Sequence, residues 1–129
     1  MPIPISNEKC GMIELENRIV GFSARCVKVC AALPVKAVGS ASFADQLFRS
    51  STSIAANYAE ACEAESAKDF IHKLKIAMKE LSETRIWLLL IGEAGYIDKT
   101  KLYDLVNESR ELSRILSASV ATAKKKLRN

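Results

Sequence analysis

The sequence predicts an all-α fold, an antiparallel up-down-up-down four-helix bundle. Helix-favouring residues such as Ala, Leu, Lys and Glu are abundant, whereas aromatic residues make up only 6% of the chain. Apolar residues recur at spacings of three and four along four stretches, and no stretch alternates polar and apolar residues as a half-buried strand would. The links between the four stretches are short. Because short links make consecutive helices antiparallel neighbours, a bundle is the expected architecture.

The length and composition predict one globular domain. The chain has 129 residues, of which 49% are hydrophobic, enough for one core but not for two. Residues 1–12 contain two prolines and a glycine, and we expect an irregular N-terminal arm there. Residues 13–127 are predicted to form the bundle.

The first two helices are bounded by turn residues. A three–four apolar stripe predicts the first helix over Ile13–Leu33, and Pro34 should end it because the residue before a proline avoids the helical region. The second helix is predicted over Ser42–Ala64. Its serine-rich middle, Ser50–Ser53, indicates close helix–helix approach, with hydroxyls bonded to the preceding turn or to a neighbouring helix.

The last two helices have clear start and stop signals. Ser66 should cap the third helix and Asp69 should meet its positive end, because a hydroxyl and a carboxylate at this spacing satisfy free backbone N–H groups. This helix is predicted to end at Ala94, before Gly95. The fourth helix is predicted over residues 98–126, with the carboxylate of its first residue as the cap.

The positive charge is concentrated at the C-terminus. The net charge is +4, from 19 Lys and Arg against 15 Asp and Glu. The last six residues contain Lys124, Lys125, Lys126 and Arg128, so the rest of the chain has 15 basic and 15 acidic side chains. A neutral body argues against a broadly basic nucleic-acid-binding surface and places the basic character in the tail.

The cysteines and the hydropathy favour a cytoplasmic protein with reduced thiols. The N-terminus lacks the apolar core of a secretory signal, and the longest apolar run, Ile86–Ile91, is too short to cross a bilayer. No CxxC motif occurs among the four cysteines. Cys26 and Cys30 lie one helical turn apart, where they are either metal ligands or small buried side chains.

The third helix has a second, mixed stripe about 100° from its apolar one. A solvated face would not contain Ile, Trp and Leu in register, and a buried one would contain Lys and Glu only if they were paired. We interpret the stripe as a subunit interface, and the alternative is a partly exposed flank of a monomer. Its residues are Lys73, Ile76, Glu80, Glu83, Trp87 and Leu90.

A third line on the same helix is basic or titratable. It consists of Lys68, His72, Lys75 and Lys79. Such a line either follows a phosphate backbone or is the solvated face of the helix.

The sequence predicts no enzyme, metal site or cofactor. A carboxylate-bridged di-iron site in a bundle needs two Glu-x-x-His motifs, and His72 is the only histidine in the chain. No serine is placed to form a triad with it, and neither GxxxxGK[ST] nor GxGxxG occurs.

The stretch from residue 43 to 97 contains an ordered set of residues that includes two helices and their turn. Its residues are Gln46-Leu47, Arg49-Ser50, Thr52-Ser53-Ile54, Ala56-Asn57-Tyr58, Glu60-Ala61, Ala64-Glu65-Ser66, Asp69 to Leu74, Ile76-Ala77, Lys79-Glu80, Glu83-Thr84, Trp87-Leu88 and Gly95-Tyr96-Ile97. With these residues the stretch resembles a known family, the four helix bundle proteins, also called the 23S rRNA intervening-sequence proteins.

The resemblance implies a bacterial cytosolic bundle without enzymatic activity that assembles into a homopentameric ring. It also implies a relationship to accessory proteins of diversity-generating retroelements, which bind a reverse transcriptase and nucleic acid through a basic surface. Where many members have glycine after Thr-Ser-Ile, this chain has Ala55.

Two functions follow as hypotheses, and a third is an enzyme or metal protein. The first is an oligomeric module that binds RNA or DNA through its basic tail, where ring symmetry would multiply the tails. The second is a scaffold that presents helix faces to another protein, such as a reverse transcriptase, and does not bind nucleic acid. The basic residues considered for the first are Arg49, Lys75, Lys79, Lys124, Lys125, Lys126 and Arg128.

Overall fold

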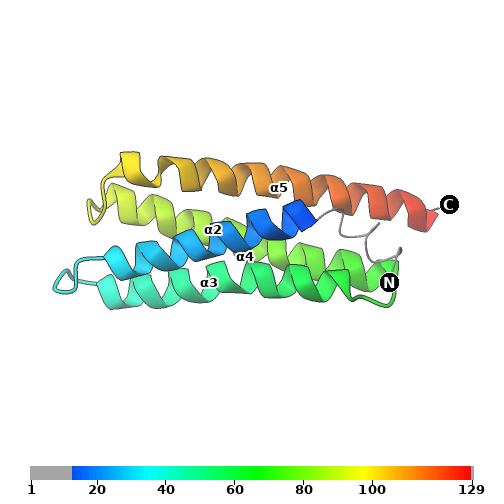
Figure 1. Cartoon of the computed structure of the whole chain (residues 1–129), viewed down its shortest axis with the longest axis horizontal. Helices are drawn as coiled ribbons and strands as arrows, with labels where there is room; N and C mark the ends of the chain where they lie inside the picture. Colours follow the sequence, from blue (N-terminus) through cyan, green and yellow to red (C-terminus); the bar gives the residue numbers. More distant parts are fainter. Residues whose placement is uncertain (1–12, 129) are drawn as a thin grey trace.

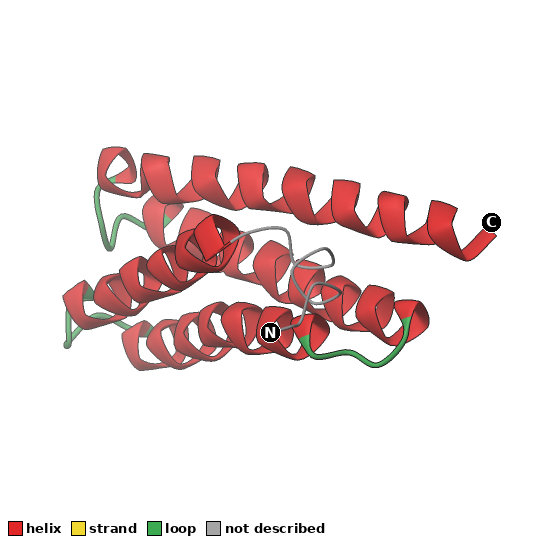
Figure 2. Ribbon diagram, turned by 45° about the vertical axis from the view of Figure 1, so that its right-hand side comes forward, coloured by secondary structure: helices red, strands yellow, loops and turns green. Residues whose placement is uncertain are grey.

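The structure is a computed structural model that describes residues 13–128, and the predicted arm 1–12 lies outside them. Within the described range it has four helices and no strand (Figures 1 and 2). Each helix runs antiparallel to the next, so the predicted all-α fold with four helices is confirmed. The helices are α2 (Ile13–Ala32), α3 (Ser40–Cys62), α4 (Ala67–Glu93) and α5 (Lys99–Arg128).

Three helix pairs hold the bundle together. α3 packs against both α2 and α4, and α4 packs against α5, whereas α2 and α5 touch much less. A bidentate ion pair connects this last pair of helices, because Arg18 donates from Nε and Nη2 to the Glu108 carboxylate at 3.0 and 2.7 Å. Exposed pairs of this kind contribute up to about 1 kcal/mol, so the packed apolar stripes supply most of the stability.

The core is formed by the apolar stripes predicted from the sequence. The strongest of them, on α4, is buried along its whole length: Phe70, Leu74, Ala77, Leu81, Thr84, Leu88 and Ile91. Fully buried side chains from the other three helices pack against it, and they include Ile19, Phe22, Leu47, Ile54, Leu112 and Leu116. Each such side chain contributes about 1.5–3 kcal/mol through removal from water.

Buried hydroxyl groups cross this apolar core. Ser23 Oγ on α2 donates to the backbone carbonyl of Ser51 on α3 at 2.7 Å. Thr84 Oγ1 on α4 donates to Ser50 Oγ on α3 at 2.8 Å. Because the side chains are small and satisfied, the helices can approach closely here without leaving polar atoms unpaired. The prediction of hydroxyl bonds across to a neighbouring helix is confirmed.

Both ends of α4 have the predicted caps. The backbone N–H of Asp69 donates to Ser66 Oγ at 3.0 Å, which satisfies one free donor of the first turn. At the other end Gly95 has φ 78°, and the Tyr96 N–H donates back to the Ile91 carbonyl at 3.1 Å. This is the Schellman arrangement, in which a left-handed residue closes the last turn.

The start of α3 was predicted wrongly by two residues. The helix begins at Ser40 and not at Ser42, because Gly39 has φ 81° and acts as its N-cap residue. A left-handed glycine lets the chain turn into the helix at once. The cap of α5 is as predicted, since Asp98 Oδ1 accepts the Thr100 N–H at 2.9 Å and this bond lowers the Asp98 pKa.

Candidate nucleic-acid interface

The mixed stripe of α4 lies against α3. The Arg49 guanidinium on α3 contacts the carboxylates of Glu80, at 3.2 Å, and of Glu83. Glu83 also accepts the indole N–H of Trp87 at 3.0 Å, and this bond and the one from Arg49 lower the Glu83 pKa. The Trp87 ring meets Phe43 of α3 edge-on, with 6.0 Å between centroids. The Arg49 charge is therefore neutralised within the chain.

The remaining residues of this stripe follow the same side of α4. Lys73 donates to the Glu60 carboxylate of α3 at 2.7 Å, Ile76 is half-buried, and Leu90 is 44% exposed. Pairing with α3 explains how a face with Lys and Glu also contains Trp and Ile. The stripe thus contributes to packing within the chain, and the subunit interface assigned to it stays a prediction.

The candidate basic residues of α4 and α5 lie in the first half of α4 and the last turns of α5, toward one end of the bundle. α4 begins where α5 ends (Figure 1), so the two basic segments are neighbours. All of the side chains are exposed: Lys68, His72, Lys75 and Lys79 on α4, and Lys124, Lys125, Lys126 and Arg128 on α5. We call this set the basic end. The sequence-predicted nucleic-acid residues other than Arg49 belong to it.

Lys75 and Lys124 connect the two halves of the basic end. The charge of Lys75, acting at close range, lowers the pKa of Lys124. Within residues 13–128 no carboxylate forms an ion pair with any member of the basic end. Two neighbouring ammonium groups without a counter-ion repel each other, and a bound anion relieves this repulsion.

Arg85 is a cation that the sequence reasoning missed. From the α5-facing side of α4 it donates to Ser109 Oγ at 3.2 Å and to Ser113 Oγ at 3.4 Å. Its partners are neutral hydroxyls, so its charge is not compensated by them. The sequence did contain a signal for Arg85. Positions 75, 78, 82 and 85 follow one another at spacings of three and four, which places Arg85 on the same side of α4 as Lys75.

The cysteines of the described residues are of two kinds, free and disulfide-bonded. Cys26 and Cys30 are free, and burial raises the pKa of Cys26 to about 12, which disfavours the thiolate that a metal needs. Cys30 Sγ donates to the Ala44 carbonyl at 3.4 Å, and the described residues contain no metal-binding group of three side chains. Cys62 is disulfide-bonded, so the expectation of reduced thiols is wrong at this residue.

Comparison with known proteins assigns the family. The family model of the 23S rRNA-intervening sequence protein matches residues 13–118, which include α2, α3, α4 and most of α5. The chain belongs to this family. The resemblance seen in the α3–α4 stretch is thereby confirmed, and the family match extends it to α2 and to most of α5.

A solved structure of a relative has the same fold. It is a protein of unknown function from the S23 ribosomal protein family of Bacteroides thetaiotaomicron, 34% identical, and the alignment covers 82% of this chain and 97% of the relative with a TM-score of 0.74. No curated protein matches the chain. In the part of the chain that the structure describes, no helix is both long and apolar enough to cross a membrane.

Proposed function

We propose that this protein is a non-enzymatic cytoplasmic module that associates with RNA or DNA through its basic end. The observation that supports this most is the exposure of these lysines where the start of α4 lies beside the end of α5, with Lys75 close enough to Lys124 to lower its pKa. Arg49 is the weakest of the candidate contacts, because Glu80 and Glu83 neutralise it.

The expected mode of binding is electrostatic and independent of base sequence. Lysines that approach phosphates release condensed counter-ions, so affinity falls with salt by about 0.7 logarithmic units per contact for single strands. Removal of Lys124, Lys125, Lys126 and Arg128 should therefore reduce the salt slope by up to about 3.

The experiment compares the full chain, a truncation after Ala123 and the variant Lys75→Gln/Lys124→Gln by fluorescence anisotropy with labelled RNA and DNA over a salt series. The matched control is Lys36→Gln/Lys101→Gln, which removes two exposed lysines outside the basic end. Weaker binding and a smaller slope in the first two variants but not in the control are expected. Absent binding at low salt, or equal effects of the control, contradicts the proposal.

We also propose that the protein is a homo-oligomer, and the family resemblance suggests a pentameric ring. Exposed apolar side chains on α4 support a contact between copies, since Ile86 is 53% and Leu90 44% exposed beside the half-buried Trp87. Light scattering of the purified chain tests this, with Leu90→Glu expected to shift the assembly toward the 14.2 kDa monomer. A monomer in the unmodified protein contradicts it.

A second candidate function is a protein-interaction scaffold or accessory subunit, for example of a reverse transcriptase. The same exposed α4 residues favour it, because contiguous apolar side chains on a surface mark a contact with protein. Co-purification from the native host distinguishes the two functions. One protein partner without nucleic acid supports the scaffold, whereas nuclease-sensitive material supports the basic-end proposal.

A further inference from the structure

A second cationic pair lies on the same side of the α4–α5 pair as Lys75 and Lys124. Arg85 is half-buried and held by two serine hydroxyls of α5, and Arg110 of α5 is exposed. Burial, together with the nearby positive charge of Arg110, lowers the pKa of Arg85. Within residues 13–128 neither guanidinium makes an ion pair with a carboxylate.

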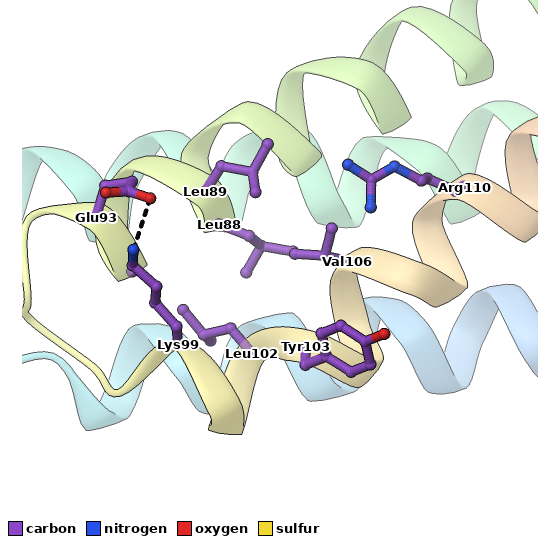
Figure 3. A pocket seen from close by; sticks show the side chains of 9 residues that line it. Leu88, Leu89, Glu93, Lys99, Leu102, Tyr103, Val106 and Arg110 are labelled. Atoms are coloured by element: carbon purple, nitrogen blue, oxygen red, sulfur yellow. Dashed lines mark ion pairs between the residues drawn. The ribbon is translucent and has the colours of Figure 1, made fainter.

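Arg110 also borders an apolar cavity of about 210 Å³ between α4 and α5. Figure 3 shows the Arg110 side chain reaching toward this cavity from one side, with Leu88 on the α4 side and the ring of Tyr103 at the α5 rim. The opposite side is closed by the ion pair between Glu93 and Lys99, at 2.7 Å. The cavity thus has apolar walls, an aromatic ring at its rim and one cation without a counter-charge, Arg110.

Tyr103 is placed as a stacking platform. Its side chain is 65% exposed although it is large and mostly apolar, so it contributes little to the core. It lies seven residues before Arg110, which puts both side chains on one face of α5 about 10 Å apart. Leu89, 38% exposed, faces the cavity from α4.

The surface between the two cationic pairs contains no acidic residue. At three–four spacing from Lys75 to Leu89, α4 places Met78, Ser82 and Arg85 on this side. The corresponding positions of α5 between Arg110 and Lys124 are Ser113, Ser117 and Ala121. Lys75 and Arg85 are ten residues apart on α4, about 15 Å along its axis, the span of a few nucleotides.

We infer that the α4–α5 face binds single-stranded nucleic acid, with one unstacked base in the cavity against Tyr103 and a neighbouring phosphate on Arg110 and Arg85. The strand then continues along the serine-lined surface to Lys75 and Lys124. This inference rests on the proposed nucleic-acid function. It adds that the nucleic acid is single-stranded and that the strand runs from the cavity to Lys75 and Lys124. A duplex is a poorer fit, because its bases are stacked and paired and cannot enter the cavity.

Charge complementarity also decides against the same face of a second copy as the occupant. Two copies meeting face to face here would bring the four guanidinium groups of Arg85 and Arg110 together without counter-charges. An anionic strand neutralises these groups, and its bases cover the Tyr103 ring and the apolar walls.

The test measures binding of a labelled single-stranded RNA, and of the same RNA annealed to its complement, by the full chain, four new variants and Lys75→Gln/Lys124→Gln. Tyr103→Ala should weaken single-strand binding by about 5- to 150-fold without changing the salt slope, because stacking releases no counter-ions. Tyr103→Phe keeps the ring and should bind like the unmodified protein. Arg110→Gln should lower the salt slope by about 0.7. Lys101→Gln, another exposed cation of α5, is the matched control for Arg110→Gln and should leave the slope unchanged.

The outcomes separate this inference from the proposed function. If Lys75→Gln/Lys124→Gln weakens RNA binding but Tyr103→Ala and Arg110→Gln do not, the cavity site is overturned while the basic end stands. Equal losses for single strand and duplex in Tyr103→Ala overturn the single-strand assignment. If Tyr103→Ala changes the oligomeric state but not RNA binding, the nucleic-acid site at the cavity is overturned and a second copy of the chain is its occupant. Circular dichroism melts confirm that each variant is folded.

Discussion

The hydrogen bond between Thr84 and Ser50 should couple α3 and α4 energetically. Both side chains are fully buried, and Thr84 Oγ1 donates to Ser50 Oγ at 2.8 Å. Thr84→Val keeps the shape of the side chain but leaves the Ser50 oxygen without its donor. Loss of one neutral hydrogen bond costs about 1 kcal/mol, and the unpaired buried oxygen adds to it, so we expect about 1–2 kcal/mol.

The partner variant removes the acceptor. Ser50→Ala leaves the buried Thr84 hydroxyl without an acceptor on α3, and a cost of about 1–3 kcal/mol follows unless the hydroxyl turns back to its own helix. In the double variant both polar groups are absent, so no unpaired atom remains. Its destabilisation should fall below the sum of the single values by about 1–2 kcal/mol.

Urea unfolding measures this coupling, with the fluorescence of Trp87, the only tryptophan, as the probe and one chain concentration throughout. Thr84→Ser is the matched control, since it loses a methyl group but keeps the hydroxyl. Equal m-values in all variants are required for the comparison. If the single values add to within about 0.5 kcal/mol, Thr84 and Ser50 are not coupled and the reasoning is refuted.

Three further predictions concern stability. Gly21→Ala should raise the free energy of unfolding by about 0.5–1 kcal/mol, because an added Cβ meets nothing within 4 Å. Gly92→Ala should not stabilise the protein, because a Cβ there would lie 3.3 Å from the Lys99 side chain of α5. Thermal melts of the two variants test this. Stability should fall as pH rises from 9.0 to about 12, since in that window the unfolded chain ionises Cys26 while the folded chain keeps it neutral. Urea melts across the window should show a flatter fall in Cys26→Ala. Ser66→Ala should lower the free energy of unfolding by about 1 kcal/mol, because the Asp69 N–H loses its cap. Ser66→Asp should lower it much less, because a carboxylate also caps a helix, and urea melts measure both variants.

The helix ends show where local sequence is sufficient. Ser66, Gly95 and Asp98 were predicted correctly because capping depends on residues within one turn of the helix end. The start of α3 was missed because Gly39 adopts a left-handed conformation, which glycine permits but does not require.

The mixed stripe of α4 shows what periodicity leaves open. Spacing identified Lys73, Glu80, Glu83 and Trp87 as one face, and we interpreted its Lys and Glu as the polar part of a subunit interface. It did not identify the partner, because the period gives the direction of a side chain and not the helix it meets. The structure supplies Arg49 and Glu60 of α3 as partners. A contact between copies on this side of α4 therefore has only the side chains that remain exposed next to this face, such as Ile86 and Leu90.

The charge argument from composition was incomplete for a related reason. Equal numbers of acidic and basic residues outside the tail suggested a neutral body, but a sum contains no positions. Within residues 13–128 the ion-paired cations are Arg18, Arg49, Lys73, Lys99 and Arg114, and each neutralises a glutamate. Lys75, Arg85 and Arg110 are left without a carboxylate on the α4–α5 face, and Lys124 joins them there. A chain with a neutral body can thus have several unpaired cations on one face, and under the proposed function the field near that face, not the net charge, steers an anionic strand.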